Sequence, residues 1–271
     1  MKARFMAVVA VVSAVSAVGG YFLFEYFRPA EITDLPQIVV IPAGEYNIRL
    51  IGDYRIDNQI VDAPIQLKNF KSALRIMKYQ VSQDEYDLCV QDHGCLKTHI
   101  SAGENMPQVA ISYYDAIAYA KWFSTKTKLN WRLPTAQEWQ RAAGDKYVDP
   151  SFGNLNDKDD PAKRWVLEYK RQTQLRGESD LELRPRGANG ENNLGLFDVS
   201  SNVWEWTSTC YLNVHLDKDG NTELNTSENC GVRAAEGKHV AYIIEFVRDA
   251  KVGGCAVGIP PDFLGFRLVL E

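Results

Sequence analysis

The chain has 271 residues, a formal net charge of −5, a hydrophobic fraction of 45% and an aromatic fraction of 11%. This composition is typical of a packed globular protein, and it excludes collagen-like, coiled-coil and multi-span membrane classes. The mild acidity is spread along the chain, and no basic stripe is present to follow a phosphate backbone, so we expect no nucleic-acid partner.

The chain begins with an apolar segment that indicates its compartment. Phe5–Phe24 carries no charge, and its twenty residues match the hydrocarbon thickness of a bilayer. Lys2 and Arg4 precede it, which favours a cytoplasmic N-terminus. We therefore predict a transmembrane signal anchor over residues 1–28, single-pass in the inner membrane, with the rest of the chain in the periplasm.

Two other interpretations of this segment remain open. The small residues Val15-Ser16-Ala17 meet the rule for signal-peptide cleavage, which would release the protein into the periplasm. The segment is also compatible with a buried core helix. After it, residues 29–36 are predicted to form a linker and residues 37–271 a single domain.

Five cysteines fit an oxidising compartment. Cys89 and Cys95 flank a short loop that a disulfide can close, and they are the first expected pair. Cys210 and Cys230 flank a polar stretch and are the second candidate pair. With these two pairings, Cys255 has no disulfide partner. The sequence does not fix this connectivity.

A zinc site is the alternative for the first cysteine pair. His93 and His99 interleave with Cys89 and Cys95, so two thiolates and two imidazoles lie within eleven residues. Zinc fingers instead separate their two ligand pairs by a longer segment. A disulfide is therefore the simpler expectation in an oxidising compartment.

Three helix starts are indicated by capping boxes, in which two side chains satisfy free backbone N–H groups. They begin at Ser82, Ser112 and Thr135, each followed three residues later by Glu or Asp. In the second helix we expect Ile117 on the core-facing stripe. A fourth helix is expected over 161–175, and short strands with many turns elsewhere, so the predicted fold class is α+β.

Several segments, in chain order, resemble the motifs of one family, the sulfatase-modifying-factor or formylglycine-generating-enzyme superfamily. The resemblance covers about residues 37–271 and implies one α+β domain related to C-type lectins, with much irregular backbone. The segments that carry it are Val39–Tyr46, Ile76–Ser82, Ser112–Ala116, Arg132–Trp139, Asn193–Val199, Asn202–Trp206 and Gly265–Val269.

The resemblance also identifies what is missing. The best-known members oxidise a cysteine of a substrate peptide to formylglycine, with oxygen and with copper held by two thiolates five residues apart. Thiolate is a soft ligand that suits copper(I). The resemblance places His239 and Ile244 at these two positions, and Ile244 has no ligand atom. We therefore expect neither copper nor formylglycine synthesis.

A structural calcium ion is a further implication of the resemblance. In the family, the turn before the Trp-Glu-Trp motif supplies carbonyl and carboxylate oxygens, which are ligands that calcium prefers. Carried over, the ligands are the backbones of Ser200, Ser201 and Val203 and the side chain of Glu205. Ser201 replaces a glycine and would be strained at a positive φ. The alternative is that Glu205 hydrogen-bonds the protein directly.

Two acidic runs resemble calcium loops by composition alone. Asp217–Asn221 lacks the spacing of an EF-hand, and a hairpin turn at Asp219-Gly220 explains it better. Asn156–Asp160 is interpreted as a solvated loop before the fourth helix.

The resulting functional hypothesis is a membrane-anchored extracytoplasmic accessory protein that binds or helps to mature another periplasmic protein. One alternative is an oxygen-dependent oxidoreductase that acts on a peptide or peptide-derived metabolite, and another is a lectin-like carbohydrate-binding module. The candidate pocket of the oxidoreductase consists of Trp206, Glu236, His239, Arg248 and Cys255.

Overall fold

A computed structural model describes most of the chain after the apolar segment. The predicted anchor over 1–28 lies outside the described residues, as does the predicted fourth helix apart from residue 166. Among the helices that are described, none is long and apolar enough to cross a membrane. The described residues are 32, 34–100, 103–151, 166, 182–249, 255–257 and 263–271, with only the backbone considered over 255–257.

The three predicted capping boxes are confirmed. In each, the N-cap hydroxyl accepts a hydrogen bond from the backbone N–H three residues later, and the acidic side chain there accepts one from the N-cap N–H. Such a cap stabilises a helix by about 1 kcal/mol. The helices are α2 (Gln83–Gln91), α3 (Tyr113–Thr127) and α4 (Ala136–Ala143), and a 3-10 turn, η1 (Gly144–Lys146), follows α4.

The buried face of α3 differs from the prediction at one position. Ala116, Tyr119 and Phe123 are buried, whereas Ile117 is 37% exposed. The buried face is centred near Tyr119, and Ile117, two residues before it, is displaced by about 160° around the helix. The Tyr119 ring instead anchors the face, packing against Phe266 with ring centroids 5.3 Å apart.

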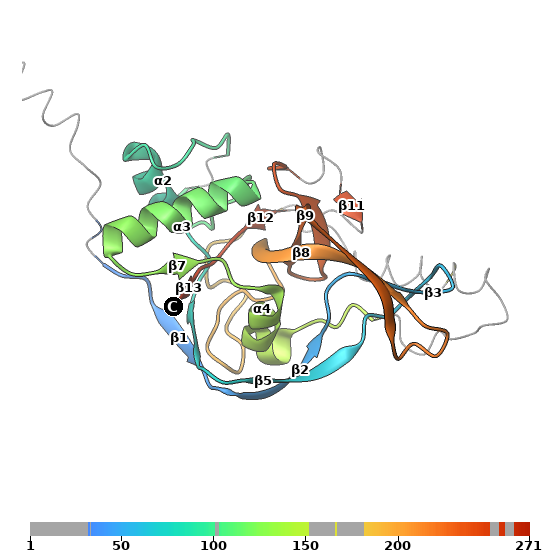
Figure 1. Cartoon of the computed structure of the whole chain (residues 1–271). Helices are drawn as coiled ribbons and strands as arrows, with labels where there is room; N and C mark the ends of the chain where they lie inside the picture. The colour runs from blue at the N-terminus through green and yellow to red at the C-terminus, as the bar shows by residue number, and fades with distance from the viewer. Residues whose placement is uncertain are drawn as a thin grey trace, which may run out of the picture. The chain divides into compact units, whose positions relative to one another are not determined.

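A small antiparallel sheet brings the two ends of the domain together (Figure 1). The last strand of the chain lies between two strands from earlier parts of the sequence, and Val269 pairs with both Ile76 and Arg132. The strand order is β1 (Ile38–Ile41), β6 (Leu74–Met77), β13 (Val269–Leu270) and β7 (Trp131–Arg132).

The larger sheet is built on a long hairpin of β8 and β9. Its turn carries Gly220 at a φ of 73°, and the Asp217 N–H donates to the Thr222 carbonyl, which confirms the predicted hairpin turn. In this sheet β12 pairs with β8. The strand order is β11 (Cys255–Val257), β10 (Ala241–Ile244), β9 (Glu223–Glu236), β8 (Trp204–Leu216), β3 (Asp53–Ile56) and β4 (Gln59–Val61), with β12 at Leu264–Gly265.

Helix α4 lies between the large sheet and the two-stranded sheet of β2 (Gly44–Arg49) and β5 (Ile65–Phe70), as Figure 1 shows. Trp139 of α4 is buried in a core cluster with Ile76 and Val269 of the small sheet. The neighbouring Trp139 and Gln140 side chains reach two different strands of the large sheet, as described below. Helix α4 therefore connects all three sheets at the middle of the domain.

Both expected disulfides are confirmed. Cys89 is bonded to Cys95, with Cα atoms 5.3 Å apart, and Cys210 to Cys230, with Cα atoms 4.5 Å apart. The first bond consumes both thiols of the alternative zinc site with His93 and His99, so that alternative is wrong.

Candidate functional site

Glu205 lies at the centre of a fully buried polar cluster. Each of its carboxylate oxygens accepts two hydrogen bonds. Arg267 donates to both oxygens, from Nε and Nη2, at 2.6 Å each. The Gln80 amide donates to Oε1 and the Trp139 indole to Oε2, both at 2.8 Å. The side chains of Glu205 and Arg267 are 1% and 0% exposed, so this is a bidentate ion pair shielded from solvent.

The hydrogen bonds of Glu205 decide whether its carboxylate can bind the expected calcium ion. A calcium ion at the Glu205 carboxylate would meet the fixed positive charge of Arg267 and would displace hydrogen bonds that already satisfy both oxygens. The left-handed residues of the turn are Ser200, at a φ of 56°, and Asn202, at 61°, and Ser201 is not among them. Glu205 as arranged does not fit calcium, and the direct hydrogen-bonding alternative describes it. A calcium ion held by the turn backbone alone stays a prediction.

Glu236 is a second buried carboxyl group on the same face of the sheet. It pairs with Glu205 across β8 and β9, and the Gln140 amide donates to its Oε1 at 3.2 Å. Burial raises the pKa of Glu236 to about 7, a change that the Gln140 hydrogen bond opposes and the Glu205 charge reinforces. Glu236 is therefore an acid that titrates close to neutral pH.

Trp206 and Arg248 are held by partners other than Glu236. Trp206 is the strand residue next to Glu205, so its side chain points to the opposite face of the sheet, where its indole donates to the Ile111 carbonyl at 3.0 Å. Arg248 donates to both carboxylate oxygens of Asp115 at the start of α3, at 2.8 and 2.6 Å. Trp206 and Glu236, two of the five residues of the expected pocket, thus lie on opposite faces of the sheet.

His239 and Ile244 occupy the positions where the resemblance expects the copper thiolates. His239 is 5% exposed, its ring lies edge-on to Trp204 at 5.1 Å, and its Nδ1 is 3.0 Å from the Val240 carbonyl oxygen. Ile244 pairs with Val232 in the β10–β9 ladder. These residues do not fit a copper(I) site with two thiolates, because an imidazole and an alkyl side chain replace both sulfurs.

Cys255 is the remaining cysteine that could supply sulfur near His239 and Ile244. Cys255 belongs to β11, where it pairs with Ile243 of β10, and its side chain lies outside the described part. The four cysteines whose side chains are described are all oxidised.

The partners of Glu205 were not predicted from the sequence. Gln80, Trp139 and Arg267 each stand in a segment that carries the family resemblance, and that was the only signal available for them. They are separated from Glu205 by 125, 66 and 62 residues. Spacing along the chain gives no indication that such distant side chains meet at one carboxylate.

Comparison with known proteins identifies the family of this chain. The chain matches the Sulfatase-modifying factor enzyme 1-like domain over residues 23–271. The chain belongs to this family. The match begins before the predicted domain start at residue 37 and includes the end of the predicted anchor. The family assignment expected from the motifs is therefore confirmed.

The relatives include both active and inactive members. The formylglycine-generating enzyme of Mycobacterium tuberculosis is 34% identical over 38% of this chain and 33% of its own length. The inactive C-alpha-formylglycine-generating enzyme 2 of Mus musculus is 33% identical over 39% of this chain and 33% of its own length. The matched regions thus span about a third of each of these two relatives.

A solved structure supports the fold over nearly the whole chain. The structure of PvdO from Pseudomonas aeruginosa aligns with a TM-score of 0.58 at 21% identity, covering 90% of this chain and 99% of that chain. Similarity at this level of identity shows the shared fold and nothing about shared chemistry.

Proposed function

We propose that this member of the family is an accessory protein without formylglycine-generating activity, which binds or helps to mature another extracytoplasmic protein. The observation that carries the proposal is the pair His239 and Ile244 at the thiolate positions, since neither residue supplies sulfur. A relative that is named an inactive C-alpha-formylglycine-generating enzyme supports the proposal. The predicted anchor over 1–28 would hold the domain at the membrane.

An exposed apolar patch is suited to such a partner. Phe246 is 71% exposed, Tyr114 is 56% exposed and Ile117, one turn further along α3, is 37% exposed. Phe246 directly follows Glu245, whose carboxylate accepts a hydrogen bond from the Tyr114 hydroxyl at 2.6 Å. Grouped apolar and aromatic side chains at a surface are typical of protein interfaces, whereas single ones are common everywhere. We assign this patch, Tyr114, Ile117 and Phe246, to a protein client.

The absence of the catalytic metal site is tested by restoring it. Wild-type protein should fail to compete with a chromophoric chelator for copper(I), whereas the double variant His239→Cys, Ile244→Cys should take up one ion. Wild-type protein supplied with copper and oxygen should yield no aldehyde from a cysteine-containing substrate peptide of the family. Aldehyde formation by the wild type would overturn the proposal.

The client surface is tested by site-specific photo-crosslinking in cells that produce the full chain. A crosslinker at position 246 should give one defined adduct, and a crosslinker at Leu224, which is 68% exposed on the hairpin, should not. The same adduct should weaken when Tyr114 is replaced by Ser. No adduct at 246, or equal adducts at both positions, would refute the assignment of the patch.

A second candidate function is oxygen-dependent oxidation of a peptide or peptide-derived metabolite. The observation that favours it is Glu236, whose pKa of about 7 suits a general acid or base at physiological pH. Oxygen uptake with cysteine peptides that is lost in Glu236→Gln and retained in Glu271→Gln would establish it in place of the accessory role.

A further inference from the structure

The two disulfides of the described part differ in their exposure to solvent. Cys89 and Cys95 are 0% and 8% exposed, so both of their sulfurs are shielded from an external reagent. In the other pair Cys210 is 9% exposed, but Cys230 is exposed. Cys230 is therefore the half of this disulfide that faces solvent, and an attack there would release the sulfur of the buried Cys210.

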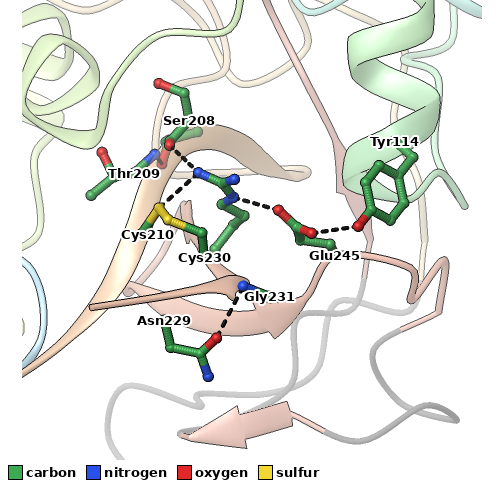
Figure 2. The surroundings of a disulfide bond; sticks show 10 residues. Tyr114, Ser208, Thr209, Cys210, Asn229, Cys230, Gly231 and Glu245 are labelled. Carbon is green, nitrogen blue, oxygen red and sulfur yellow. Dashed lines mark hydrogen bonds and ion pairs between the residues drawn. A yellow bond between two sulfur atoms is a disulfide. The ribbon is translucent and has the colours of Figure 1, made fainter. Parts of the chain in front are cut away.

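The buried sulfur of this pair has a cationic partner. The Arg233 guanidinium donates from Nη1 to Cys210 Sγ at 2.9 Å and to the Ser208 carbonyl at 2.7 Å. Its Nε donates to Glu245 at 2.7 Å, and Figure 2 shows Glu245 held in turn by the Tyr114 hydroxyl. Arg233 is thus fixed in place before any bond at Cys210 breaks.

This arrangement matches the requirements of thiol–disulfide exchange. A fixed cation that donates a hydrogen bond to sulfur favours the thiolate over the thiol, which lowers the pKa of the released thiol. Exchange is faster when the leaving thiol has a low pKa and when the attacked sulfur is accessible. The Arg233 contact at Cys210 serves the first condition, and the exposure of Cys230 serves the second.

We propose that Cys210–Cys230 is a thiol–disulfide exchange site, at which a cysteine thiolate of another polypeptide attacks Cys230 and releases Cys210. The proposal goes beyond the accessory role, since it assigns a chemical reaction to the domain. It does not require the copper thiolates of the family, because neither cysteine lies at those positions.

The reaction is balanced by the partner's own thiols. A bond forms between the partner sulfur and Cys230 Sγ, and the Cys210–Cys230 bond breaks with its electron pair on Cys210. A second thiolate of the partner then attacks the partner's first sulfur and releases Cys230. The partner dithiol is oxidised to a disulfide by two electrons, the pair here is reduced, and the two thiol protons of the partner pass to Cys210 and Cys230.

Two nearby carboxylates oppose this reaction: Glu245, whose ion pair partly offsets the charge of Arg233, and Glu228. The Glu228 carboxylate lies within 4.8 Å of both sulfurs. Its negative charge repels an incoming thiolate and disfavours a thiolate on Cys210. The Arg233 contact is shorter and includes a hydrogen bond, so we expect the attraction to exceed the repulsion. Glu228→Gln should therefore accelerate exchange. Because this variant removes a charge and keeps the size of the side chain, a faster rate would come from electrostatics and not from better access to the disulfide.

The test uses the full chain in reduced glutathione, with an acid quench, alkylation of free thiols and mass spectrometry of each cysteine. Cys210–Cys230 should open at least roughly tenfold faster than Cys89–Cys95, which serves as the internal control in the same molecule. In the trapped intermediate, glutathione should be attached to Cys230 and the alkyl group to Cys210. Arg233→Gln should slow opening by roughly tenfold, and Arg233→Lys, which retains the charge, should restore part of the rate.

Three results would each overturn the proposal. The first is equal opening of the two disulfides, and the second is glutathione attached to Cys210. The third is an Arg233→Gln variant that folds, as shown by unchanged circular dichroism, and opens as fast as the wild type. If Arg233→Gln does not fold, Arg233→Lys and Glu228→Gln supply the same comparison, and wild-type rates in both would also overturn it.

Discussion

Replacing Glu205 by Gln tests whether the buried ion pair organises the core. The change keeps the size of the side chain but leaves the Arg267 guanidinium, which is 0% exposed, without a counter-charge. Breaking a buried pair by removing one partner costs about 3–5 kcal/mol, because the remaining charge has neither water nor an opposite charge to stabilise it. We therefore expect Glu205→Gln to lower the free energy of unfolding by that amount.

The measurement is urea unfolding followed by tryptophan fluorescence, with both disulfides intact. At an m value of about 3 kcal/mol/M, the midpoint should fall by about 1–1.7 M. The matched control is Glu271→Gln, which removes a carboxylate from Arg132 in a pair whose side chains are 46% and 36% exposed. Exposed ion pairs contribute about 0–1 kcal/mol to stability, so the urea midpoint of Glu271→Gln should differ little from that of the wild type.

If Glu205→Gln lowered the free energy of unfolding no more than Glu271→Gln does, the buried ion pair would not stabilise the core as described. A separate arm repeats the wild-type titration with a calcium chelator present. If chelation alone reproduced the loss seen in Glu205→Gln, the carboxylate would act as a calcium ligand, and the ion pair with Arg267 would not be the source of the stability.

Two further predictions concern neighbouring residues. The pKa of Glu236 is raised from 4.5 to about 7 in the folded state. Between these two pH values the folded state therefore holds a proton that the unfolded state has released. The stability that this proton contributes is fully present below about pH 4.5 and is lost as the pH rises through 7. Glu236→Gln should remove this slope in unfolding measured between pH 4.5 and 7.5, and an unchanged slope would contradict it. At Gly237 a Cβ would lie 2.6 Å from Trp204, so Gly237→Ala should cost about 1–3 kcal/mol in thermal unfolding, and a wild-type midpoint would disprove this close approach.

The correct sequence predictions rest on short-range interactions. The N-cap of α3 is encoded by Ser112 and Asp115, three residues apart, and the structure has both hydrogen bonds between them. The Cys89–Cys95 disulfide joins residues six apart in the sequence, and the hairpin turn lies within a few residues of Gly220. Such features form wherever the local sequence permits, since few backbone angles have to be fixed.

The face of the sheet on which Trp206 lies could not be predicted from the sequence. Trp206, Glu236 and Arg248 belong to the pocket that is expected from the sequence. Which face of a sheet a residue occupies depends on strand register, and a shift of one residue reverses it. The pairing of Glu205 with Glu236 sets that register and sends Trp206 to the other face.

The sequence by itself determined the family, the capped helices and the local disulfide, because each depends on residue identity at short spacing. The tertiary structure alone decided that Gln80, Trp139 and Arg267 converge on Glu205, and that Arg233 lies against Cys210. These contacts join segments from different strands and helices, and packing of the whole core, which no local pattern encodes, brings them together.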